Sequence, residues 1–401
     1  MTTPKSIQLI RKTGAIPLLL KGQGVFVFSV VDVSNCSCQF STADGSNGVQ
    51  ITWTKDQIVG RTLQSGEQLL DPNNKAGLTV NAPLWISLDY NNQRILAGVG
   101  EARTETALYR YTFPETSRSF LESLTQVTDL AACTPLRLLR DPVTHAIPLL
   151  VKDTHELTMH HIAAATYMPR ANLSTIAQTL HACIAGPRFI LDDKDFPHFS
   201  KAIEASISDP SGWCHQRLLA KANEFGSGPG PGQPLETYLR ITLNQNNGES
   251  PGIPYVMEVW PPGHYSPVHN HAGANAIIRV LHGAIDVSLF PYLSSGVEPF
   301  GITSFKKDNI TWISPTLNQT HQLRNTDPFT TCITIQCYMY DEKDRNHYDY
   351  FDYLDVEGAT KQYEPDSDMD FVAFKELMKQ EWANRTVPKN QTSWFCYPVC
   401  H

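Results

Sequence analysis

The sequence predicts a mainly β protein in which two strand-rich regions are joined by a helical connection. Over residues 1–115, short segments rich in β-branched and aromatic residues alternate with polar turn clusters. Between 116 and 225 the apolar residues change to helical spacing, and strand-like segments return after Pro234. A chain of 401 residues has room for two or three domains of this kind.

Residues 1–115 are expected to form a β-sandwich, because several short strands at regular spacing with polar turns are typical of that fold. The apolar segment 24–33 reads GVFVFSVVDV. The strand–turn–strand pattern of 84–90 and 95–100, which ends in Gly-x-Gly, resembles the β-sandwich module of the farnesoic-acid-methyltransferase type over roughly 20–115. The resemblance implies a binding or packing module with an unidentified ligand or partner, and it does not imply methyl transfer.

Residues 116–170 are expected to be a mixed connecting segment that begins with a helix over 117–128. Further helices are predicted at 173–184, 196–207, 213–222 and 370–383. Ser174 and Thr175 are suitable caps for the first of these. The low-complexity stretch 226–234, GSGPGPGQP, is interpreted as an inter-domain linker or a mobile loop.

Charge and composition argue against several classes of partner. The 32 Lys and Arg against 40 Asp and Glu give a net charge of -8 and a pI near 5.9. A dedicated nucleic-acid binder would carry a basic face, so no nucleic-acid partner is expected. No window of about 20 apolar residues suggests a membrane span, and a cytoplasmic location is expected. The nine cysteines lack paired C-x-x-C motifs, so free thiols are expected rather than a structural zinc site.

The segment 260–271, WPPGHYSPVHNH, carries the strongest chemical signal of the chain. In a strand, residues i and i+2 point to the same face, so His269 and His271 would present two imidazoles side by side. His321 follows a turn that contains Pro315 and could supply a third ligand from across a barrel. Neutral imidazole is a common ligand for iron, zinc, copper and nickel. The sequence therefore predicts a metal site at these three histidines.

These segments resemble the two motifs of the cupin barrel, which is a double-stranded β-helix. The matching positions are Gly263, His269, His271 and Gly283 in the first motif, and Pro315, His321 and Asn325 in the second. The second motif lacks its usual Gly and has one extra residue. The Glu that often serves as a fourth ligand in the first motif falls at Ala276. The resemblance implies that residues 171–401 form a cupin domain with leading helices.

Loss of that Glu is the mark of cysteine-dioxygenase-like thiol dioxygenases, which the chain resembles over roughly 170–360. Tyr238 and Arg240 match the Tyr-x-Arg strand whose Arg binds the substrate carboxylate. A forked guanidinium suits a carboxylate because it can donate two parallel hydrogen bonds. Tyr338, seventeen residues after His321, matches the active-site Tyr of the family. The resemblance implies an Fe(II) cofactor, with dioxygen and a small thiol as substrates.

The same resemblance also indicates where this chain departs from its family. The family's Ser-His-Tyr relay becomes Thr334, Gln336 and Tyr338, so the central position keeps hydrogen bonding but loses a group that titrates. Ala276 stands where some members carry a Cys that is crosslinked to the Tyr, so this crosslink cannot form. The acidic and aromatic run 341–355 is expected to be a solvated loop with buried rings.

The leading hypothesis is a non-haem iron dioxygenase that converts cysteine or a related carboxylated thiol into a sulfinate. One alternative is a cupin enzyme of another class, such as a lyase or isomerase that uses the metal as a Lewis acid. Another is a non-catalytic cupin that binds a small molecule. His264, His282 and the adjacent pair His160 and His161 have no ligand spacing and are expected to be structural.

Overall fold

The computed structural model describes the chain except for short gaps. The described residues are 7–10, 14–31, 36–74, 82–131, 133–143, 147–225, 235–243, 255–271, 273–317, 319–340, 351–363 and 366–385. The proposed linker at 226–234 and most of the run 341–355 lie outside these ranges. Among the helices that are described, none has both the length and the apolar composition needed to cross a bilayer.

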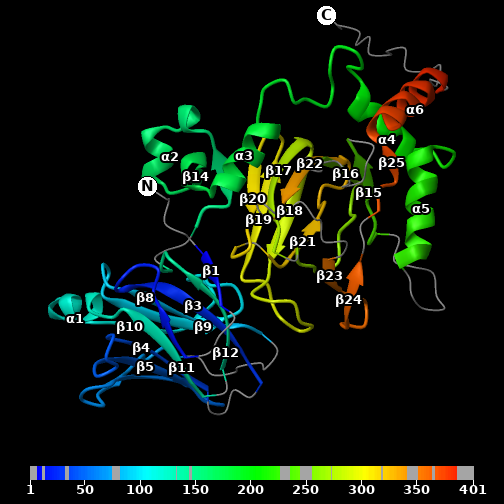
Figure 1. The fold of residues 1–401 in the computed structure, drawn as a ribbon. Helices are drawn as coiled ribbons and strands as arrows, with labels where there is room; N and C mark the ends of the chain where they lie inside the picture. Colours follow the sequence, from blue (N-terminus) through cyan, green and yellow to red (C-terminus); the bar gives the residue numbers. More distant parts are fainter. Residues whose placement is uncertain are drawn as a thin grey trace, which may run out of the picture.

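The N-terminal region is a sandwich of two six-stranded antiparallel sheets (Figure 1). The first sheet has the order β1 (Ile7–Leu9), β12 (Cys133–Leu139), β3 (Gln23–Val30), β8 (Leu84–Asp89), β9 (Arg94–Val99) and β10 (Ala107–Thr112). The second has the order β2 (Ala15–Pro17), β11 (Gln126–Ala131), β4 (Cys36–Ser41), β5 (Gly48–Trp53), β6 (Ile58–Thr62) and β7 (Gln68–Leu69).

Aromatic side chains fill the space between the two sheets. The rings of Phe28 and Trp53 meet edge to face with centroids 5.1 Å apart. Tyr109 reaches across to the opposite sheet, where its hydroxyl donates to the Leu69 carbonyl oxygen at 2.8 Å. Gly60 is required beneath this Tyr, because a Cβ there would lie 2.2 Å from the Tyr109 hydroxyl oxygen. The fold class expected for this region is confirmed.

Two details of the prediction are wrong here. The sandwich continues past residue 115, because β11 and β12 each pair with central strands and complete the two sheets. The helix expected over 117–128 is only one turn, α1 (Arg118–Glu122), before the chain enters β11. Thr125, Val127 and Thr128 are β-branched and favour a strand, and pairing of β11 with both β2 and β4 stabilises that choice.

The C-terminal region is a barrel made of two facing sheets, the arrangement of a double-stranded β-helix. The larger sheet has the order β14 (Tyr167–Pro169), β13 (Leu150–Lys152), β20 (Ile310–Ile313), β17 (Asn275–His282), β22 (Cys332–Met339), β16 (Tyr255–Trp260), β15 (Leu239–Thr242) and β25 (Met369–Asp370). The smaller sheet has the order β19 (Gly301–Lys306), β18 (Ala284–Leu289) and β21 (His321–Arg324). A separate hairpin joins β23 (Phe351–Leu354) to β24 (Thr360–Tyr363). Strands β11 and β12 belong to the sandwich, whereas β13 and β14 belong to the larger sheet of the barrel. The segment 116–170, expected to connect the domains, is therefore divided between the sandwich and the barrel.

Helices cover the outer face of the larger sheet. They are α3 (Thr175–Ile184), α4 (Phe199–Ser208), α5 (Trp213–Phe225) and α6 (Phe371–Asn384), close to the four predicted ranges. The short helix α2 (Met159–Ala163) lies in the connection before them. Ser174 caps α3 as expected, with its side chain accepting from the Ala177 amide at 3.2 Å. In Figure 1, α4, α5 and α6 lie together beyond β15 and β25.

Strand β22 separates the helical layer from the barrel interior by simple alternation. Ile333, Ile335 and Cys337 pack outward into the core shared with α3, α4 and α6. The intervening residues Gln336 and Tyr338 point into the barrel, where both line its cavity. The alternation in β22 therefore places the polar side chains of Gln336 and Tyr338 in the barrel cavity.

Candidate metal centre and pocket

Three histidines meet at one end of the barrel. Among the residues that the structure describes, His269, His271 and His321 form the group whose ring nitrogens could hold a metal ion, with ligand atoms within 4.8 Å of one another. His321 begins β21, and its backbone exchanges two hydrogen bonds with His269, at 2.9 and 3.0 Å. This backbone pairing brings a residue 50 positions further along the chain next to His271.

The histidine rings are set up to present lone pairs to a common point. His269 Nδ1 lies 3.0 Å from the Pro267 carbonyl oxygen, so Nδ1 carries the proton and Nε2 is left as the ligand atom. The Nε2 atoms of His271 and His321 are 3.1 Å apart. Two nitrogen ligands at about 2.1 Å from a metal in adjacent positions would be separated by about 3 Å. This arrangement fits a divalent transition metal.

Burial keeps the imidazoles of His269 and His271 neutral. Burial lowers the pKa of His269 to about 4, although the hydrogen bond to the Pro267 carbonyl opposes the shift. Burial also lowers the pKa of His271 well below its usual value, and the neighbouring His321 and His269 lower it further. Neutral rings are the form that binds metals, so protons compete weakly for this site.

A hairpin covers the histidines from the other side. The β23 strand pairs with the segment that carries the His-x-His motif: the Asn270 amide donates to the Asp352 carbonyl, and the Leu354 amide to the Val268 carbonyl, both at 2.9 Å. The Phe351 ring is edge-on to His271 with centroids 4.6 Å apart. Part of the run expected to be a solvated loop is thus a strand that shields the histidines from water.

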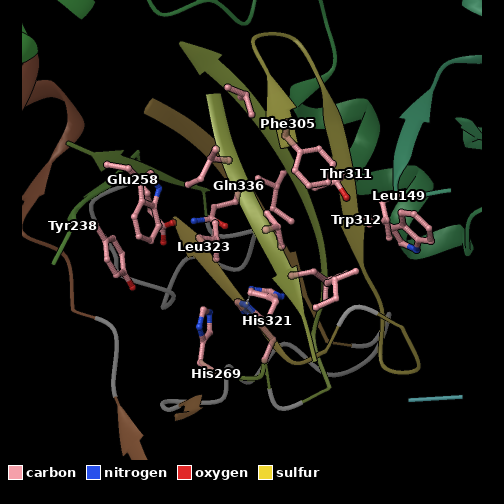
Figure 2. Close-up of a pocket in the computed structure, with 18 of the residues that line it drawn as sticks. Leu149, Tyr238, Glu258, His269, Phe305, Thr311, Trp312, His321, Leu323 and Gln336 are labelled. Carbon is pink, nitrogen blue, oxygen red and sulfur yellow. Dashed lines mark hydrogen bonds between the residues drawn. The ribbon is translucent and has the colours of Figure 1, made fainter. Parts of the chain in front are cut away.

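Beyond the histidines the barrel encloses a mainly apolar cavity, shown in Figure 2. Its apolar wall comes from both sheets and includes Ile278, Val280, Ile285, Val287, Leu289, Phe305 and Leu323. Its polar groups are the three histidines together with Tyr238, Arg240, Glu258, Asn309, Thr311, Gln336 and Tyr338. An apolar cavity with a few convergent polar groups is the usual form of a small-molecule site.

Arg240 lies in this cavity but is already paired. It is directly opposite Glu258 in the β15–β16 register, and its Nη1 lies 3.4 Å from Glu258 Oε1. Burial has the largest single effect and acts to lower the pKa of Arg240, but Glu258 and the neighbouring tyrosines together outweigh it, so the pKa is raised. Burial raises the pKa of Glu258, and Arg240 only partly offsets this effect. The pocket therefore presents a cation and an acid side by side.

The hydrogen-bond chain continues onto β22. Gln336 is a hydrogen-bond partner of Glu258, and the Tyr338 hydroxyl donates to Gln336 Oε1 at 2.7 Å. Since Oε1 accepts from Tyr338, the Gln336 amide nitrogen is the group that faces Glu258. Burial raises the pKa of Tyr338 well above its usual value, so its phenol stays protonated. Thr334 is not joined to this chain: its hydroxyl is buried with no hydrogen-bond partner among the described residues.

Packing fixes the strand that carries Tyr238 and Arg240. The Tyr238 ring stacks on Trp260 with centroids 4.1 Å apart. The Asp368 carboxylate accepts from the Arg240 amide at 2.7 Å, and it also pairs with Arg217 at 2.7 Å and with Lys221 at 2.9 Å. This buried anchor holds β15 at the edge of the pocket and leaves the Arg240 side chain directed inward.

Three further positions that the sequence singles out, Ala276, His264 and His282, lie outside the three-histidine group. Ala276 is directly opposite Tyr338 in the β17–β22 register, at the position discussed for a crosslinking Cys. His264 Nδ1 lies 2.9 Å from the Thr237 carbonyl oxygen, and His282 Nε2 lies 3.1 Å from Glu204 Oε1. Neither His264 nor His282 belongs to the three-histidine group.

Sequence reasoning missed Glu258 and Phe351. An acidic residue inside the apolar strand YVMEVW was a usable signal for Glu258, because a buried carboxylate needs a partner. Phe351 gave no such signal, because its position over His271 depends on a pairing between segments more than 80 residues apart.

Comparisons with known proteins find low sequence identity to cysteine dioxygenases. No protein-family model matches the chain. The chain is similar to cysteine dioxygenase type 1 of Danio rerio, with 21% identity over 175 residues, covering 43% of this chain and 76% of that protein. It is also similar to the Homo sapiens enzyme of the same name, with 24% identity over 120 residues, covering 30% of this chain. The chain spans about half the length (49%) of that human relative.

Solved structures with partial likeness include oxalate oxidase in complex with the substrate analogue glycolate, at 18% identity and a TM-score of 0.23. That match covers 30% of this chain and 55% of the oxidase. Another is the Cupin_2 domain of a transcriptional regulator of the XRE family from Enterobacter cloacae, at 15% identity and a TM-score of 0.21. It covers 26% of this chain and 98% of that domain.

Proposed function

We propose that the chain is a non-haem iron dioxygenase that adds both atoms of dioxygen to the sulfur of a small carboxylated thiol, such as cysteine, to give a sulfinate. The observation that carries the proposal is the three-histidine cluster, which opens into the same buried cavity as Arg240 and Tyr338. The similarity to cysteine dioxygenases supports it further.

His269, His271 and His321 would hold the iron through their ring nitrogens. Iron, when bound, would supply the redox centre at which a thiolate and dioxygen react. Three neutral ligands leave the full charge of the cation to attract an anionic thiolate. Phe351 and the β23 strand exclude water from this end of the pocket, which strengthens every electrostatic contact inside it.

Arg240 and Glu258 would orient the substrate by its charged groups. Arg240 has five N–H donors and uses Nη1 for Glu258, so other donors are available for a substrate carboxylate. Glu258 in turn can accept from a substrate ammonium. Together the pair suits a zwitterionic thiol, whose sulfur would then be directed toward the histidines.

Tyr338 would hold a proton close to the reacting sulfur. Its ring is nearly parallel to that of His271, with centroids 5.7 Å apart. Because Gln336 only accepts from the phenol and does not titrate, the Tyr338 proton is held in place rather than relayed away. The hydroxyl can turn from Gln336 to donate to the oxygen atoms that the sulfur acquires.

A second candidate is a metal-dependent lyase or isomerase, and Glu258 is the observation that favours it. A buried carboxylate with a raised pKa beside a metal site is suited to act as a general acid or base. Such an enzyme would use the metal as a Lewis acid and would not consume dioxygen.

Oxygen uptake separates the two candidates. The purified chain is loaded with Fe(II) or with Zn(II) and supplied with cysteine, cysteamine or 3-mercaptopropionate in an oxygen-electrode cell. We expect oxygen consumption only with iron and thiol together, and one sulfinate formed for each dioxygen used. Turnover that persists with zinc or without dioxygen would overturn the proposal and support the second candidate.

A further inference from the structure

The N-terminal sandwich contacts the loop that leads into the third candidate ligand. Residues 314–320 connect β20 to His321 at the start of β21. Arg137, on strand β12 of the sandwich, donates from Nη1 to the Pro315 carbonyl oxygen of this loop at 3.0 Å. Glu101, also in the sandwich domain, accepts on Oε2 from the backbone amide of Gln319 at 3.4 Å. Both ends of the loop are therefore held by charged side chains from the other domain.

Gln319 extends this connection to a second histidine. In the amide orientation that satisfies both of its groups, the side-chain nitrogen donates to the Ser314 carbonyl oxygen at 2.9 Å, and the side-chain oxygen accepts from the Gly273 amide at 2.7 Å. Gly273 lies two residues after His271, and Gln319 lies two residues before His321. One side chain thus ties together the backbones that carry two of the three candidate ligands.

The sandwich also contacts the chain just after β18, the strand that pairs with β21. His321 pairs with Leu289 at the end of β18, and the following Phe290 amide donates to the Thr320 carbonyl oxygen at 3.0 Å. The chain then reaches Pro291, whose carbonyl oxygen accepts from the Glu101 amide at 2.7 Å. Gly100 makes this approach possible: at its φ of +78°, a Cβ would lie 2.0 Å from the Pro291 carbonyl oxygen.

The interface is built from buried charges, which makes its geometry specific. Glu101 and Arg103 are 6% and 4% exposed and form an ion pair with each other. The Arg103 guanidinium also lies over the Phe300 ring of the barrel, 5.5 Å from its centroid. Burial lowers the pKa of Arg137, which Glu101 partly offsets. Such groups are costly to bury unless their partners are held in place, so a shift of one domain against the other is strongly opposed.

We propose that the sandwich helps to position the ligands of the metal centre. Arg137 and Glu101 are positioning residues that fix the backbones of His321 and His271. The inference rests on the metal site of the proposed function and does not depend on the thiol chemistry. Groups that orient metal ligands from outside typically change metal affinity by about 10- to 100-fold when they are removed. The sandwich then strengthens metal binding, although none of its described residues belongs to the three-histidine group.

The test measures Co(II) binding by the full chain. Co(II) affinity is obtained by competition with a chelator, and the visible absorption bands of the bound ion report its coordination. We expect Arg137→Ala to weaken Co(II) binding by about tenfold. Arg137→Lys keeps one donor near Pro315 and should fall between Arg137→Ala and the unchanged chain. Arg110→Ala, at an exposed site on β10 of the same sandwich, is the matched control and should bind as the unchanged chain does.

Gln319→Ala provides a second route if Arg137→Ala does not fold, because it removes the Ser314–Gly273 link within the barrel itself. It should weaken binding and alter the Co(II) bands. Equal affinity and identical bands in Arg137→Lys, Gln319→Ala and Arg110→Ala would overturn the inference. Absence of Co(II) and Fe(II) binding by the unchanged chain would overturn the metal site, and with it this inference. Normal Co(II) binding without any thiol-dependent oxygen uptake would reject only the proposed activity.

Discussion

Arg240 and Glu258 face each other on adjacent strands inside the barrel, with Nη1 3.4 Å from Oε1 and both side chains buried. The sequence predicts that Arg240 binds a substrate carboxylate, and in the structure its guanidinium already pairs with the Glu258 carboxylate. Glu258 opposes a second anion in the pocket unless the same substrate brings a cation. In the proposed enzyme, the pair would therefore favour a substrate head group with both charges over one with a carboxylate alone.

Replacement of Glu258 should broaden the range of substrates. In Glu258→Gln the amide keeps a hydrogen-bond acceptor for Arg240 but removes the negative charge. We expect kcat/KM for 3-mercaptopropionate to rise by about tenfold relative to that for cysteine, which corresponds to about 1.4 kcal/mol of discrimination. The measurement is oxygen uptake with each thiol. Glu298→Gln, at an exposed site between β18 and β19, is the control. An unchanged ratio between the two thiols would rule out charge selection by Glu258.

Arg240→Gln should separate thiols by their carboxylate. Loss of the guanidinium removes the carboxylate donor and leaves Glu258 without its cation, so we expect KM for cysteine to rise by about tenfold or more. Cysteamine has no carboxylate, and its ammonium can still meet Glu258, so its KM should change by less than about twofold. Steady-state oxygen uptake with both thiols tests this. Arg324→Gln, at an exposed site on β21, should affect neither thiol. Equal losses on both thiols would exclude Arg240 as the clamp.

The sequence predicts local features of the site better than its long-range ones. The shared face of Gln336 and Tyr338 needs only the alternation of strand β22. The two histidines two residues apart are found from their spacing, but the strand expected to carry them is absent from the described residues: His269 makes only isolated bridges, to His321 and Tyr353. Thr334 lies directly opposite Glu258, yet its hydroxyl has no hydrogen-bond partner among the described residues, whereas Gln336, opposite Val256, bonds to Glu258. That choice depends on the register between β16 and β22, which one strand's sequence does not determine.

The same limit applies at the level of the domains. The change from strand to helix spacing near 116 is a real local signal, yet β11 and β12 lie beyond it and complete the sandwich. Their pairing partners β3 and β4 precede them by about a hundred residues. Likewise, the contact of Arg137 with Pro315 joins positions 178 residues apart and has no counterpart in either motif. The motifs locate the candidate ligands in the sequence. The residues that hold the backbones of these ligands in place are brought near them only by the folded chain.

The metal-free protein should lose stability as the solution becomes acidic. In the unfolded chain His269 takes up its proton near its usual pKa of 6.5, whereas in the folded chain it does so only at about pH 4. Between these values unfolding takes up protons, so the free energy of unfolding should fall as the pH falls from about 6.5 to about 4. Urea denaturation of the metal-free chain at several pH values measures this slope. The His269→Gln variant should show a shallower slope, and an equal slope would argue against burial of a neutral His269.

A thiol introduced opposite Tyr338 tests the register that underlies the pocket. Ala276 pairs directly with Tyr338, and residues in such antiparallel pairs have Cβ atoms about 4.5–5.5 Å apart. In Ala276→Cys, the sulfur would therefore lie against the Tyr338 ring, at a fully buried site. With iron, thiol and dioxygen as the oxidant, we expect a thioether to form between the sulfur and a ring carbon. The thiol and the ring each lose a hydrogen, and dioxygen accepts the two electrons.

Intact-mass measurement should then show the loss of two hydrogens in Ala276→Cys, and peptide mapping should join β17 to β22. Ala276→Ser has a similar size but no sulfur and should keep its full mass. The double variant Ala276→Cys, Tyr338→Phe removes the phenol and should also remain uncrosslinked, because the ring is then far harder to oxidise. If Ala276→Cys folds and takes up oxygen with thiol yet keeps a free thiol and an unmodified Tyr338, the adjacency of these two side chains at the active metal site is wrong.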